Sequence, residues 1–183
     1  MRVDDAAEHF FLVTTGLVDF YVLTPNGDKL LIRRMAKGDI FGVASLLSNP
    51  QGYMGTTQAV CSSEVLVWQH HVISQLTNRY PLLAQNALRT VLGYLATSVK
   101  RHTALVSHSA EERLAYTLTR LGSRTGHTVP AGIEVKIKNE DLASLADVGY
   151  FTVSRILNRW IRTGALEKKR GRILIRCPER LIA

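Results

Sequence analysis

The longest stretch of this chain without a helix-breaking residue constrains its fold most. After Pro81 no proline occurs before Val106, and Gly93 is the only glycine in between. Along this stretch apolar residues, with one histidine among them, recur at alternating steps of four and three, and they are Leu88, Leu92, Leu95, Val99, His102 and Val106. This spacing forms a heptad seam about three heptads long, which predicts a helix that packs against a second helix.

The same stretch also favours a competing interpretation, in which the helix packs on its own domain. A second apolar stripe runs along it and consists of Leu83, Ala87, Val91 and Tyr94. Because a helix with two apolar stripes can face its own domain and a twin helix at the same time, we expect a parallel homodimer. His102 then occupies a tolerated polar position in the seam and is neither a ligand nor a pH sensor.

The first seventy residues predict β-structure. Segments rich in β-branched and aromatic residues occur at Phe10–Val13, Leu17–Leu23, Leu30–Met35 and Cys61–Trp68. Turn-forming groups lie between them at Thr24–Asp28, Lys37–Asp39 and Asn49–Gly52. Short strands with a turn every ten or so residues are typical of an antiparallel sandwich or barrel.

Beyond the long helix the chain predicts a second domain. Ser107–Glu112 has the pattern of a hinge followed by a new helix cap, so we expect the domain boundary near residue 108. The helix that follows is expected to run to about Leu121, with Gly122 and Gly126 interrupting what comes next. Ile133–Ile137 alternates as a short strand does.

Two further helices joined by a tight turn are predicted between Asn139 and Thr163. Asn139 is expected to cap the first helix, and Asp147–Gly149 forms the turn. The second helix is expected at Tyr150–Thr163, where Gly164 stops it. The apolar residues that the pair is expected to bury are Leu142, Leu145, Ala146, Val153, Ile156 and Leu157.

Positive charge is concentrated in the C-terminal part. Residues 1–108 carry 9 Lys and Arg against 7 Asp and Glu, a net charge of +2, whereas residues 109–183 carry 14 against 8, a net charge of +6. A hairpin predicted at Ala165–Ile175 holds four cations around Gly171, and these are Lys168, Lys169, Arg170 and Arg172. The distribution indicates contact with a polyanion, although a generic basic surface would carry the same charge.

These motifs resemble the Crp/Fnr family of bacterial regulators. Leu142-Ala143 followed by Thr152–Leu157 is similar to the helix-turn-helix of that family, and Gly38–Gly42 resembles the Gly-Asp-x-x-Gly of its cyclic-nucleotide-binding-type β-roll. The resemblance covers essentially the whole chain. It implies an α+β protein with an antiparallel, jelly-roll-like β-roll sensor domain in residues 1–78, a dimerisation helix and hinge in 79–108, and a winged helix-turn-helix domain in 109–183.

The resemblance implies a dimeric transcription factor and no enzyme. In this family a signal in the roll is relayed through the dimer helix to two recognition helices, which meet a palindromic site with about one helical turn between its half-sites. The implied partners are double-stranded DNA, a second copy of the chain and RNA polymerase. The alternative function is a ligand- or partner-binding module whose helix-turn-helix binds DNA without sequence specificity.

The recognition helix departs from the family pattern. That helix usually opens Ser-Arg-Glu-Thr-Val, whereas here it opens with Gly149–Val153. Arg155 is expected to pair with a guanine, and Phe151 is suited to thymine methyl groups. The residues expected to read bases are Tyr150, Phe151, Ser154 and Arg155. The residues expected to contact phosphates are Asn139, Thr152, Arg159, Lys168, Lys169, Arg170 and Arg172.

The sensor departs from the family as well. Members that bind cyclic AMP carry a Glu directly after the Gly of the phosphate loop and an Arg about ten residues on, and here those positions are Val43 and Tyr53. A buried phosphate without its guanidinium would be an uncompensated charge. We therefore expect no gating by cyclic AMP and no cofactor. The degenerate pocket is expected to comprise Gly42, Val43, Ala44, Tyr53 and Met54.

The roll is also expected to lack its first strands. Family members generally carry some twenty or more residues before the strand that matches Phe10–Val13. An open sheet edge would favour aggregation unless another segment pairs with it.

The remaining reactive side chains predict little chemistry. Cys61 and Cys177 lie far apart and outside any Cys-x-x-Cys pair, so two buried thiols are expected, with a disulfide as the alternative. His70 and His71 are expected on opposite faces of a strand, where they cannot hold one metal ion together. No metal site is predicted, and a haem held by a histidine of the roll stays an alternative. The sequence contains no signal-peptide pattern and no membrane-spanning run, so a cytoplasmic location is expected.

Overall fold

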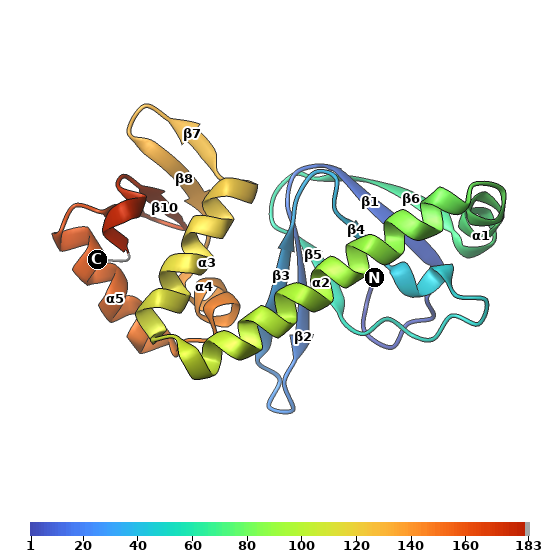
Figure 1. Ribbon diagram of the computed structural model, residues 1–183, viewed down its shortest axis with the longest axis horizontal. Helices are drawn as coiled ribbons and strands as arrows, with labels where there is room; N and C mark the ends of the chain where they lie inside the picture. Colours follow the sequence, from blue (N-terminus) through green and yellow to red (C-terminus); the bar gives the residue numbers. More distant parts are fainter. Residues whose placement is uncertain (182–183) are drawn as a thin grey trace. The chain divides into compact units, whose positions relative to one another are not determined.

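The computed structural model describes residues 1–181 and divides into two compact units, Met1–Lys100 and Arg101–Ala183 (Figure 1). The division falls inside the long helix α2 (Pro81–Ser107), which ends one residue after the predicted end at Val106. The boundary near residue 108 and the division of the chain into three parts stay predictions.

The first unit contains two three-stranded antiparallel sheets. One sheet has the order β4-β1-β6 and is formed by β4 (Ile40–Phe41), β1 (His9–Thr15) and β6 (Glu64–Gln69). The other has the order β3-β2-β5 and is formed by β3 (Lys29–Met35), β2 (Val18–Leu23) and β5 (Thr56–Ala59). The antiparallel architecture is confirmed, but β6 begins at Glu64 and not at Cys61, and β4 and β5 were not predicted. The sequence of β5 is polar, so its pairing with β2 and not its composition makes it a strand.

The core of this unit contains residues from both sheets. Val13 and Phe41 from one sheet cluster with Val18 and Met35 from the other, and all four are buried. The turn Thr24–Asp28 forms as predicted, with the Gly27 amide donating to the Thr24 carbonyl at 2.8 Å and a φ of 84° at Gly27. These contacts give the roll the antiparallel hairpins that its alternating sequence predicts.

Among the described residues, β6 pairs on one side only and forms an edge of its sheet. Val65, Leu66 and Val67 are exposed along this edge. Exposed apolar edge strands favour pairing with other chains, so the aggregation risk expected for an open edge lies at β6. The absence of the first strands stays a prediction.

The histidine pair lies on a helix, so the prediction that it lies on a strand is wrong. His70 and His71 are the first two residues of α1 (His70–Arg79), which begins directly after β6. The His70 ring nitrogen Nδ1 lies 2.6 Å from the carbonyl oxygen of Ser45, a contact that orients the first turn of α1. Within residues 1–181 no three His, Cys, Asp or Glu side chains are grouped as a metal ion would require.

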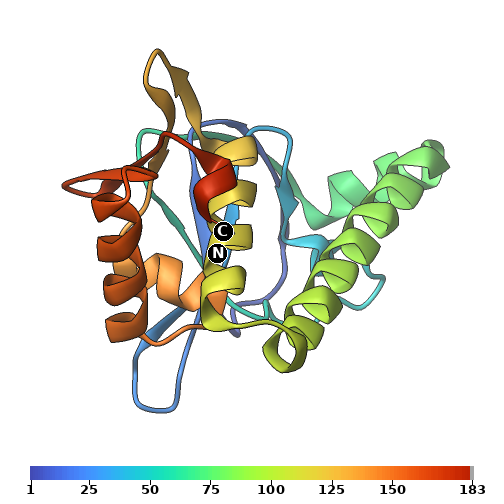
Figure 2. The same ribbon diagram turned by 60° about the vertical axis from the view of Figure 1, so that its left-hand side comes forward.

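The second unit contains three complete helices and a four-stranded antiparallel sheet (Figure 2), and the first and third of these helices pack against the sheet. Its helices are α3 (Ala110–Thr125), α4 (Asn139–Ala146) and α5 (Tyr150–Arg162). Its sheet has the order β7-β8-β10-β9 and is formed by β7 (His127–Val129), β8 (Gly132–Lys136), β10 (Arg172–Ile175) and β9 (Leu166–Lys169). A short 3-10 helix, Pro178–Leu181, follows β10. The helix-turn-helix and the hairpin after it are therefore confirmed, and β7 is an additional strand.

Helix α3 is longer than predicted. It continues through Gly122 and ends at Thr125, with Gly126 as its C-cap. A Cβ at Gly122 would lie 3.3 Å from the Ile175 side chain and 3.5 Å from the Ile133 side chain. A glycine inside a helix costs about 1 kcal/mol relative to alanine, and here the close approach of the helix to the sheet offsets that cost.

The cap of α3 forms as predicted, and Ser109 and Glu112 close it with two reciprocal hydrogen bonds. The Ser109 hydroxyl accepts from the Glu112 amide at 3.2 Å, and the Glu112 carboxylate accepts from the Ser109 amide at 2.7 Å. The hydrogen bond from the Ser109 amide lowers the pKa of Glu112, because it stabilises the ionised carboxylate. The contribution of this carboxylate to stability is therefore present above the ordinary pKa of a glutamate and is lost as the pH falls through the lowered value.

Replacing Ser109 by alanine is expected to lower the free energy of unfolding of the second unit by about 1 kcal/mol, because a donor at the helix start loses its partner. Urea denaturation followed by the fluorescence of Trp160, which lies in this unit, measures the change. Ser123→Ala in the same helix is the control and is expected to cost nothing. Equal losses from both substitutions would contradict the role of the cap.

Both cysteines are free within the described part of the chain, and each is partly exposed. The prediction that both thiols are buried is therefore wrong. Within residues 1–181 no helix has the length and apolar character that crossing a bilayer requires.

Candidate nucleic-acid interface

Helix α5 separates its side chains into a buried and an exposed face. The buried face is formed by Val153, Ile156, Leu157 and Trp160. Successive helical residues turn by about 100°, so the opposite face carries Phe151, Arg155, Asn158 and Arg162, all of them exposed. From α4, Leu142, Leu145 and Ala146 are also buried. Every residue that the sequence predicted to be buried in the helix pair is therefore buried, and Trp160 is added to them.

The turn between α4 and α5 is held by two arginines from outside the helix pair. Asp147 adopts the left-handed conformation, with φ 53° and ψ 48°. The Arg101 guanidinium donates to both carboxylate oxygens of Asp147, at 3.0 and 2.7 Å, and to the Ser144 carbonyl at 3.0 Å. Arg113 donates to the carbonyls of Ala146 and Asp147 at 3.3 and 3.0 Å. These contacts fix the turn that orients α5 against α4, and no local sequence signal predicted them.

The predicted cap of α4 is wrong by one residue. Lys138, with φ −90° and ψ 159°, is the residue before the helix, and Asn139 is its first helical residue. No side chain closes this helix start with a hydrogen bond. Glu140 and Asp141 lie in the first turn, where the helix dipole favours negative charge. Asn139 therefore does not use its side chain as a cap, and it is half-buried.

The first turn of α5 presents two aromatic rings to solvent. Phe151 is 86% exposed and Tyr150 is 45% exposed, and the two rings meet edge to face at 5.7 Å and 80°. This turn contains no acidic residue. Arg155 is exposed one turn further on, and no acidic partner for its guanidinium exists among residues 1–181. Thr152 and Ser154 are half-buried at the margins of the exposed face.

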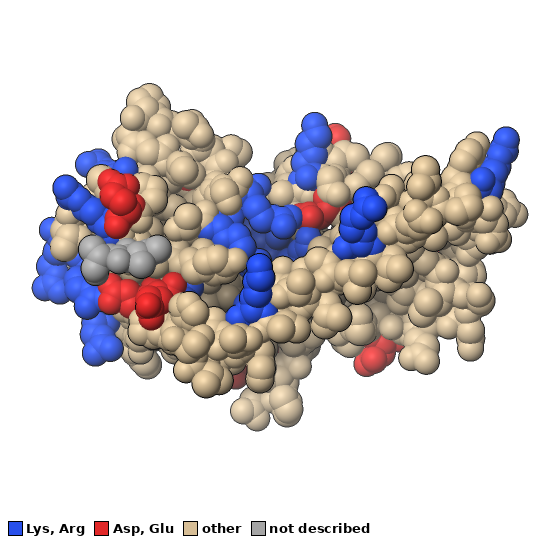
Figure 3. Space-filling view, in the orientation of Figure 1, with Lys and Arg blue, Asp and Glu red and all other residues tan. Residues whose placement is uncertain are grey.

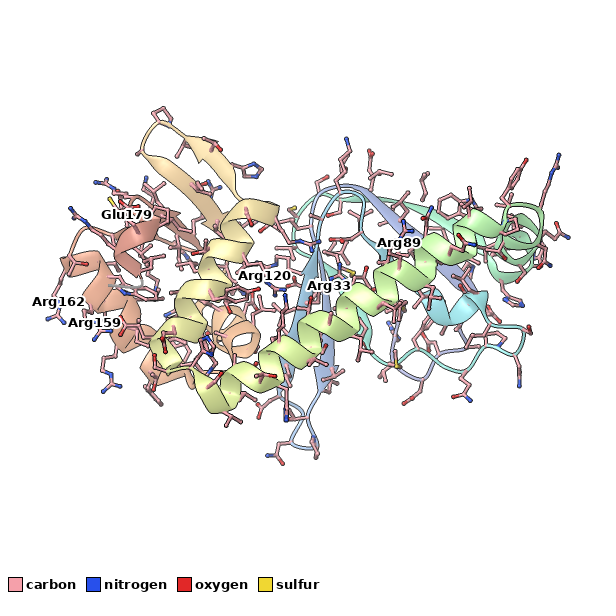
Figure 4. All side chains as sticks on the ribbon, viewed as in Figure 1. Arg33, Arg89, Arg120, Arg159, Arg162 and Glu179 are labelled. Atoms are coloured by element: carbon pink, nitrogen blue, oxygen red, sulfur yellow. The ribbon has the colours of Figure 1, made fainter. Side chains whose placement is uncertain are left out.

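Asn158 and Arg162 share the exposed face with Phe151 and Arg155 but were not predicted as site residues. They lie seven and eleven residues after Phe151, which places them on the same side of a helix of 3.6 residues per turn. The helical period was therefore a signal that would have identified both. Figure 4 labels Arg162 on the outer side of α5, beside Arg159.

Arg159 has a partner within the unit. Its guanidinium forms an ion pair with Glu111 of α3, and the Trp160 indole donates to the same carboxylate at 3.1 Å. A shallow pocket of about 480 Å³ lies here and is lined by Glu111, Arg159, Trp160, Thr163 and Arg180. The Arg159 guanidinium, which was predicted to contact a phosphate, therefore links the end of α5 to the start of α3 through its ion pair with Glu111.

The hairpin β9-β10 forms the expected basic wing. Gly171 turns at its tip with a φ of 71°. Arg172 is paired with Glu134 at 2.8 Å, and Lys169 lies 3.6 Å from Glu167. Lys168 and Arg170 are exposed and have no acidic partner in the described chain. Figure 3 shows Lys and Arg side chains gathered over α5 and this hairpin.

The two stripes of α2 differ in their surroundings. The apolar seam residues Leu88, Leu92, Leu95, Val99 and Val106 are between 54% and 88% exposed, and His102 is exposed among them. From the second stripe, Ala87 is buried and the Tyr94 hydroxyl donates to the Ile40 carbonyl at 3.1 Å. The Arg33 guanidinium lies 3.4 Å above the Tyr94 ring (Figure 4). The second stripe therefore faces the roll as expected, although Leu83 and Val91 stay exposed.

Gly42 and Tyr53, two of the residues predicted to form a degenerate pocket, lie against the backbone of His9. Gly42 has a φ of 72°, and a Cβ there would lie 2.5 Å from the His9 carbonyl oxygen. The Tyr53 hydroxyl accepts from the His9 amide and donates to the His9 carbonyl, both at 2.9 Å. Burial raises the pKa of Tyr53, so the ring is a neutral phenol. Val43 and Ala44 form part of a 3-10 helix, Val43–Leu46, and Met54 is exposed. These residues do not fit a cyclic nucleotide, because neither Val43 nor Tyr53 offers a charge or a free hydroxyl.

Comparison with known proteins agrees with this arrangement. Residues 112–183 match the Crp-like helix-turn-helix domain, and residues 1–80 match the cyclic nucleotide-binding domain. Electron transport regulator A of Shewanella oneidensis is 24% identical over 173 residues, which cover 93% of this chain and 68% of that protein. The anaerobic regulatory protein of Bacillus subtilis is 26% identical over 172 residues, which cover 92% of this chain and 72% of that protein.

Two solved structures share the fold over nearly the whole chain. FixK2 from Bradyrhizobium japonicum is 22% identical with a TM-score of 0.81, and the match covers 98% of this chain and 88% of FixK2. A CRP/FNR-family transcriptional regulator from Thermus thermophilus is 19% identical with a TM-score of 0.79, and the match covers 99% and 94% of the two chains. The two domain matches in this order, together with regulators that are similar over almost all of this chain, show that the chain belongs to the Crp/Fnr family of DNA-binding transcriptional regulators.

Proposed function

We propose that this regulator binds a palindromic operator as a parallel homodimer and reads each half-site with the exposed face of α5. The observation that carries the proposal is the division of α5 into an apolar buried face and an outer face with Phe151 and Arg155 at its start. Residues near the start of a recognition helix meet base edges in the major groove. Positive charge on the adjacent wing supplies the sequence-independent part of the affinity.

The exposed seam of α2 supports the homodimer. Five large apolar side chains at heptad spacing on one helix form a continuous surface that a monomer would leave in water. A second copy of α2 in parallel orientation covers the same residues on both chains, as a two-fold interface requires. The division into a sensor in residues 1–78, a dimer helix and hinge in 79–108 and a DNA-binding domain in 109–183 is part of this proposal.

Each set of site residues has a distinct role in the proposal. Arg155 pairs with a guanine through its O6 and N7, and Tyr150, Phe151 and Ser154 contact the neighbouring bases. The phosphate contacts come from Asn139, Thr152, Lys168, Lys169, Arg170 and Arg172, to which the structure adds Asn158 and Arg162 as candidates. Arg159 and Arg172 contribute less than the others, because Glu111 pairs with Arg159 and Glu134 pairs with Arg172. Arg101 and Arg113 act indirectly, by holding the turn that orients α5.

The proposal includes RNA polymerase as a partner and a cytoplasmic location. A factor bound at an operator alters transcription by contacting the polymerase or by blocking its access to the promoter. Val43 and Tyr53 give cyclic AMP no usual contacts, so the proposal contains no gating by that ligand.

Selection from a random duplex pool tests sequence-specific binding. The full chain is expected to enrich a two-fold symmetric sequence, and its affinity for that sequence should exceed its affinity for random DNA by about 10³ or more at physiological salt. Anisotropy titrations across a salt series separate the sequence-specific part of the affinity from the electrostatic part that all DNA sequences share. A steep salt dependence with equal affinity for both DNAs would instead identify the module that binds DNA without sequence specificity.

Arg155→Ala and Arg170→Ala are expected to weaken binding in different ways. Loss of Arg155 should remove about 1–3 kcal/mol of discrimination at one base pair of each half-site, because a bidentate contact to guanine is lost. Loss of Arg170 should weaken binding to all sequences alike and reduce the salt slope by about two, one for each protomer of the proposed dimer. Titrations against the selected operator and single-base variants measure both effects. Equal losses on all sequences from both variants would contradict the assigned roles.

A further inference from the structure

We propose that Phe151 reads the C5-methyl group of a thymine in each half-site, so that the protein discriminates thymine from uracil at that position. This inference rests on the proposed function and specifies the chemistry of its base contacts. The juxtaposition that carries it is an 86% exposed phenyl ring in the first turn of α5 and an exposed arginine one turn later on the same face.

The orientation of the ring is set by its surroundings. The buried face of α5 lies opposite Phe151 and is filled by Val153, Ile156, Leu157 and Trp160. The rings of Tyr150 and Phe151 meet edge to face with their centroids 5.7 Å apart, so Tyr150 restricts the Phe151 ring from one side. Phe151 therefore stays on the outer face in the free protein, where its apolar surface is in water.

The neighbours of Phe151 on the outer face identify the occupant of this surface. Arg155 and Arg162 share that face, and the wing adds Lys168 and Arg170. An apolar ring at the start of a face that also carries arginines suits a polyanion with an apolar group inside a polar groove. The major groove of DNA meets this description, because thymine alone presents a methyl group there, while its phosphates line both sides.

The first turn of α5 cannot recognise a cytosine through a carboxylate, which is the other base contact that this position could provide. It contains no acidic residue, so no side-chain carboxylate is available there for the amino group of cytosine. Phe151 and Arg155 are four residues apart, which places their Cβ atoms about 6 Å from each other. Since base pairs are spaced by about 3.4 Å, the thymine and the guanine are expected within about two base pairs of one another.

The test uses the operator selected by the wild-type chain, with each thymine replaced in turn by deoxyuridine. This change removes one methyl group and preserves base pairing. At one symmetric position the wild-type protein is expected to lose about fourfold in affinity for one changed half-site and about fifteenfold for both, as burial of one methyl group implies. At the other thymines the exchange is expected to have little effect.

Variants of Phe151 attribute the loss to this side chain. Phe151→Ala is expected to bind the thymine operator more weakly than the wild-type protein does. This variant should bind the thymine and uracil operators with equal affinity. Phe151→Leu should retain part of the discrimination. Selection with Phe151→Glu should change the preferred base at this position to cytosine, because a carboxylate accepts from its amino group. All three variants are expected to fold normally, since the position is exposed, and circular dichroism checks this.

Three outcomes overturn the inference, and each is distinguishable from the others. If the wild-type chain enriches an operator but tolerates uracil at every thymine, Phe151 does not read a methyl group, and the proposed function stands. If Phe151→Ala retains full discrimination between thymine and uracil, the methyl group is read by another residue. A wild-type chain that enriches no sequence overturns the proposed function and this inference together.

Discussion

Replacing Leu92 and Leu95 together by glutamate is expected to convert the proposed dimer to a monomer and to lower operator affinity at least about a hundredfold. Both side chains lie in the middle of the exposed seam of α2. In the dimer each substitution would place a carboxylate in an apolar interface without a partner, which is strongly unfavourable. A monomer also loses the advantage of linked half-sites, which raises affinity by about 10²–10⁴ in bivalent binding.

Sedimentation velocity measures the change in assembly, and anisotropy titration against a two-half-site operator measures the change in affinity. Leu82→Glu is the matched control, since Leu82 is also an exposed leucine of α2 but lies about 120° away from the seam. The control is expected to remain dimeric and to bind normally. A double variant that stays dimeric would show that the seam does not form the interface.

Replacing Trp160 by alanine is expected to destabilise the second unit by about 3–5 kcal/mol. The indole is 2% exposed and packs in the centre of the buried face of α5, and it donates to Glu111 at 3.1 Å. The substitution removes this packing and leaves a cavity, and it also removes a donor that joins α5 to α3. Because 1 kcal/mol shifts the melting temperature of a domain of this size by about 4–8 °C, the melting temperature of the second unit should fall by about 12 °C or more.

Calorimetry of the full chain measures this loss as a lower melting temperature of the second unit. Phe151→Ala is the control in the same helix, because an exposed ring contributes little to the core and a surface substitution changes stability by about 0.5 kcal/mol or less. The two variants should therefore lose different properties: Trp160→Ala should lose stability, and Phe151→Ala should lose base discrimination. Similar stability losses in both would contradict the division of α5 into two faces.

Elements that depend on local periodicity were predicted closely. Helix α2 ends within one residue of its predicted end, because its apolar steps continue without a breaker from Pro81 onward. The helix pair α4 and α5 and its six buried residues follow from the period of 3.6 residues in the same way. The turn Thr24–Asp28 follows from Asn-Gly chemistry, which needs no distant partner.

Elements that depend on distant contacts were missed. The polar strand β5 exists because β2 pairs with it, and α3 continues past Gly122 because the sheet packs closely there. His70 lies on a helix, although the strand before it suggested otherwise. In each case a contact formed by folding outweighs a local preference of about 1 kcal/mol or less.

The sequence by itself therefore determined the order of antiparallel strands, long helix and helix pair with its hairpin, the exposed seam of α2 and the residues on each face of the recognition helix, because these depend on spacing along the chain. Only the tertiary structure decided which charges remain available for DNA. Arg159 is neutralised by Glu111 and Arg172 by Glu134, while Arg155 and Arg170 have no acidic partner among the described residues. Ion pairing depends on distance in space, and these partners are separated by more than thirty residues in sequence.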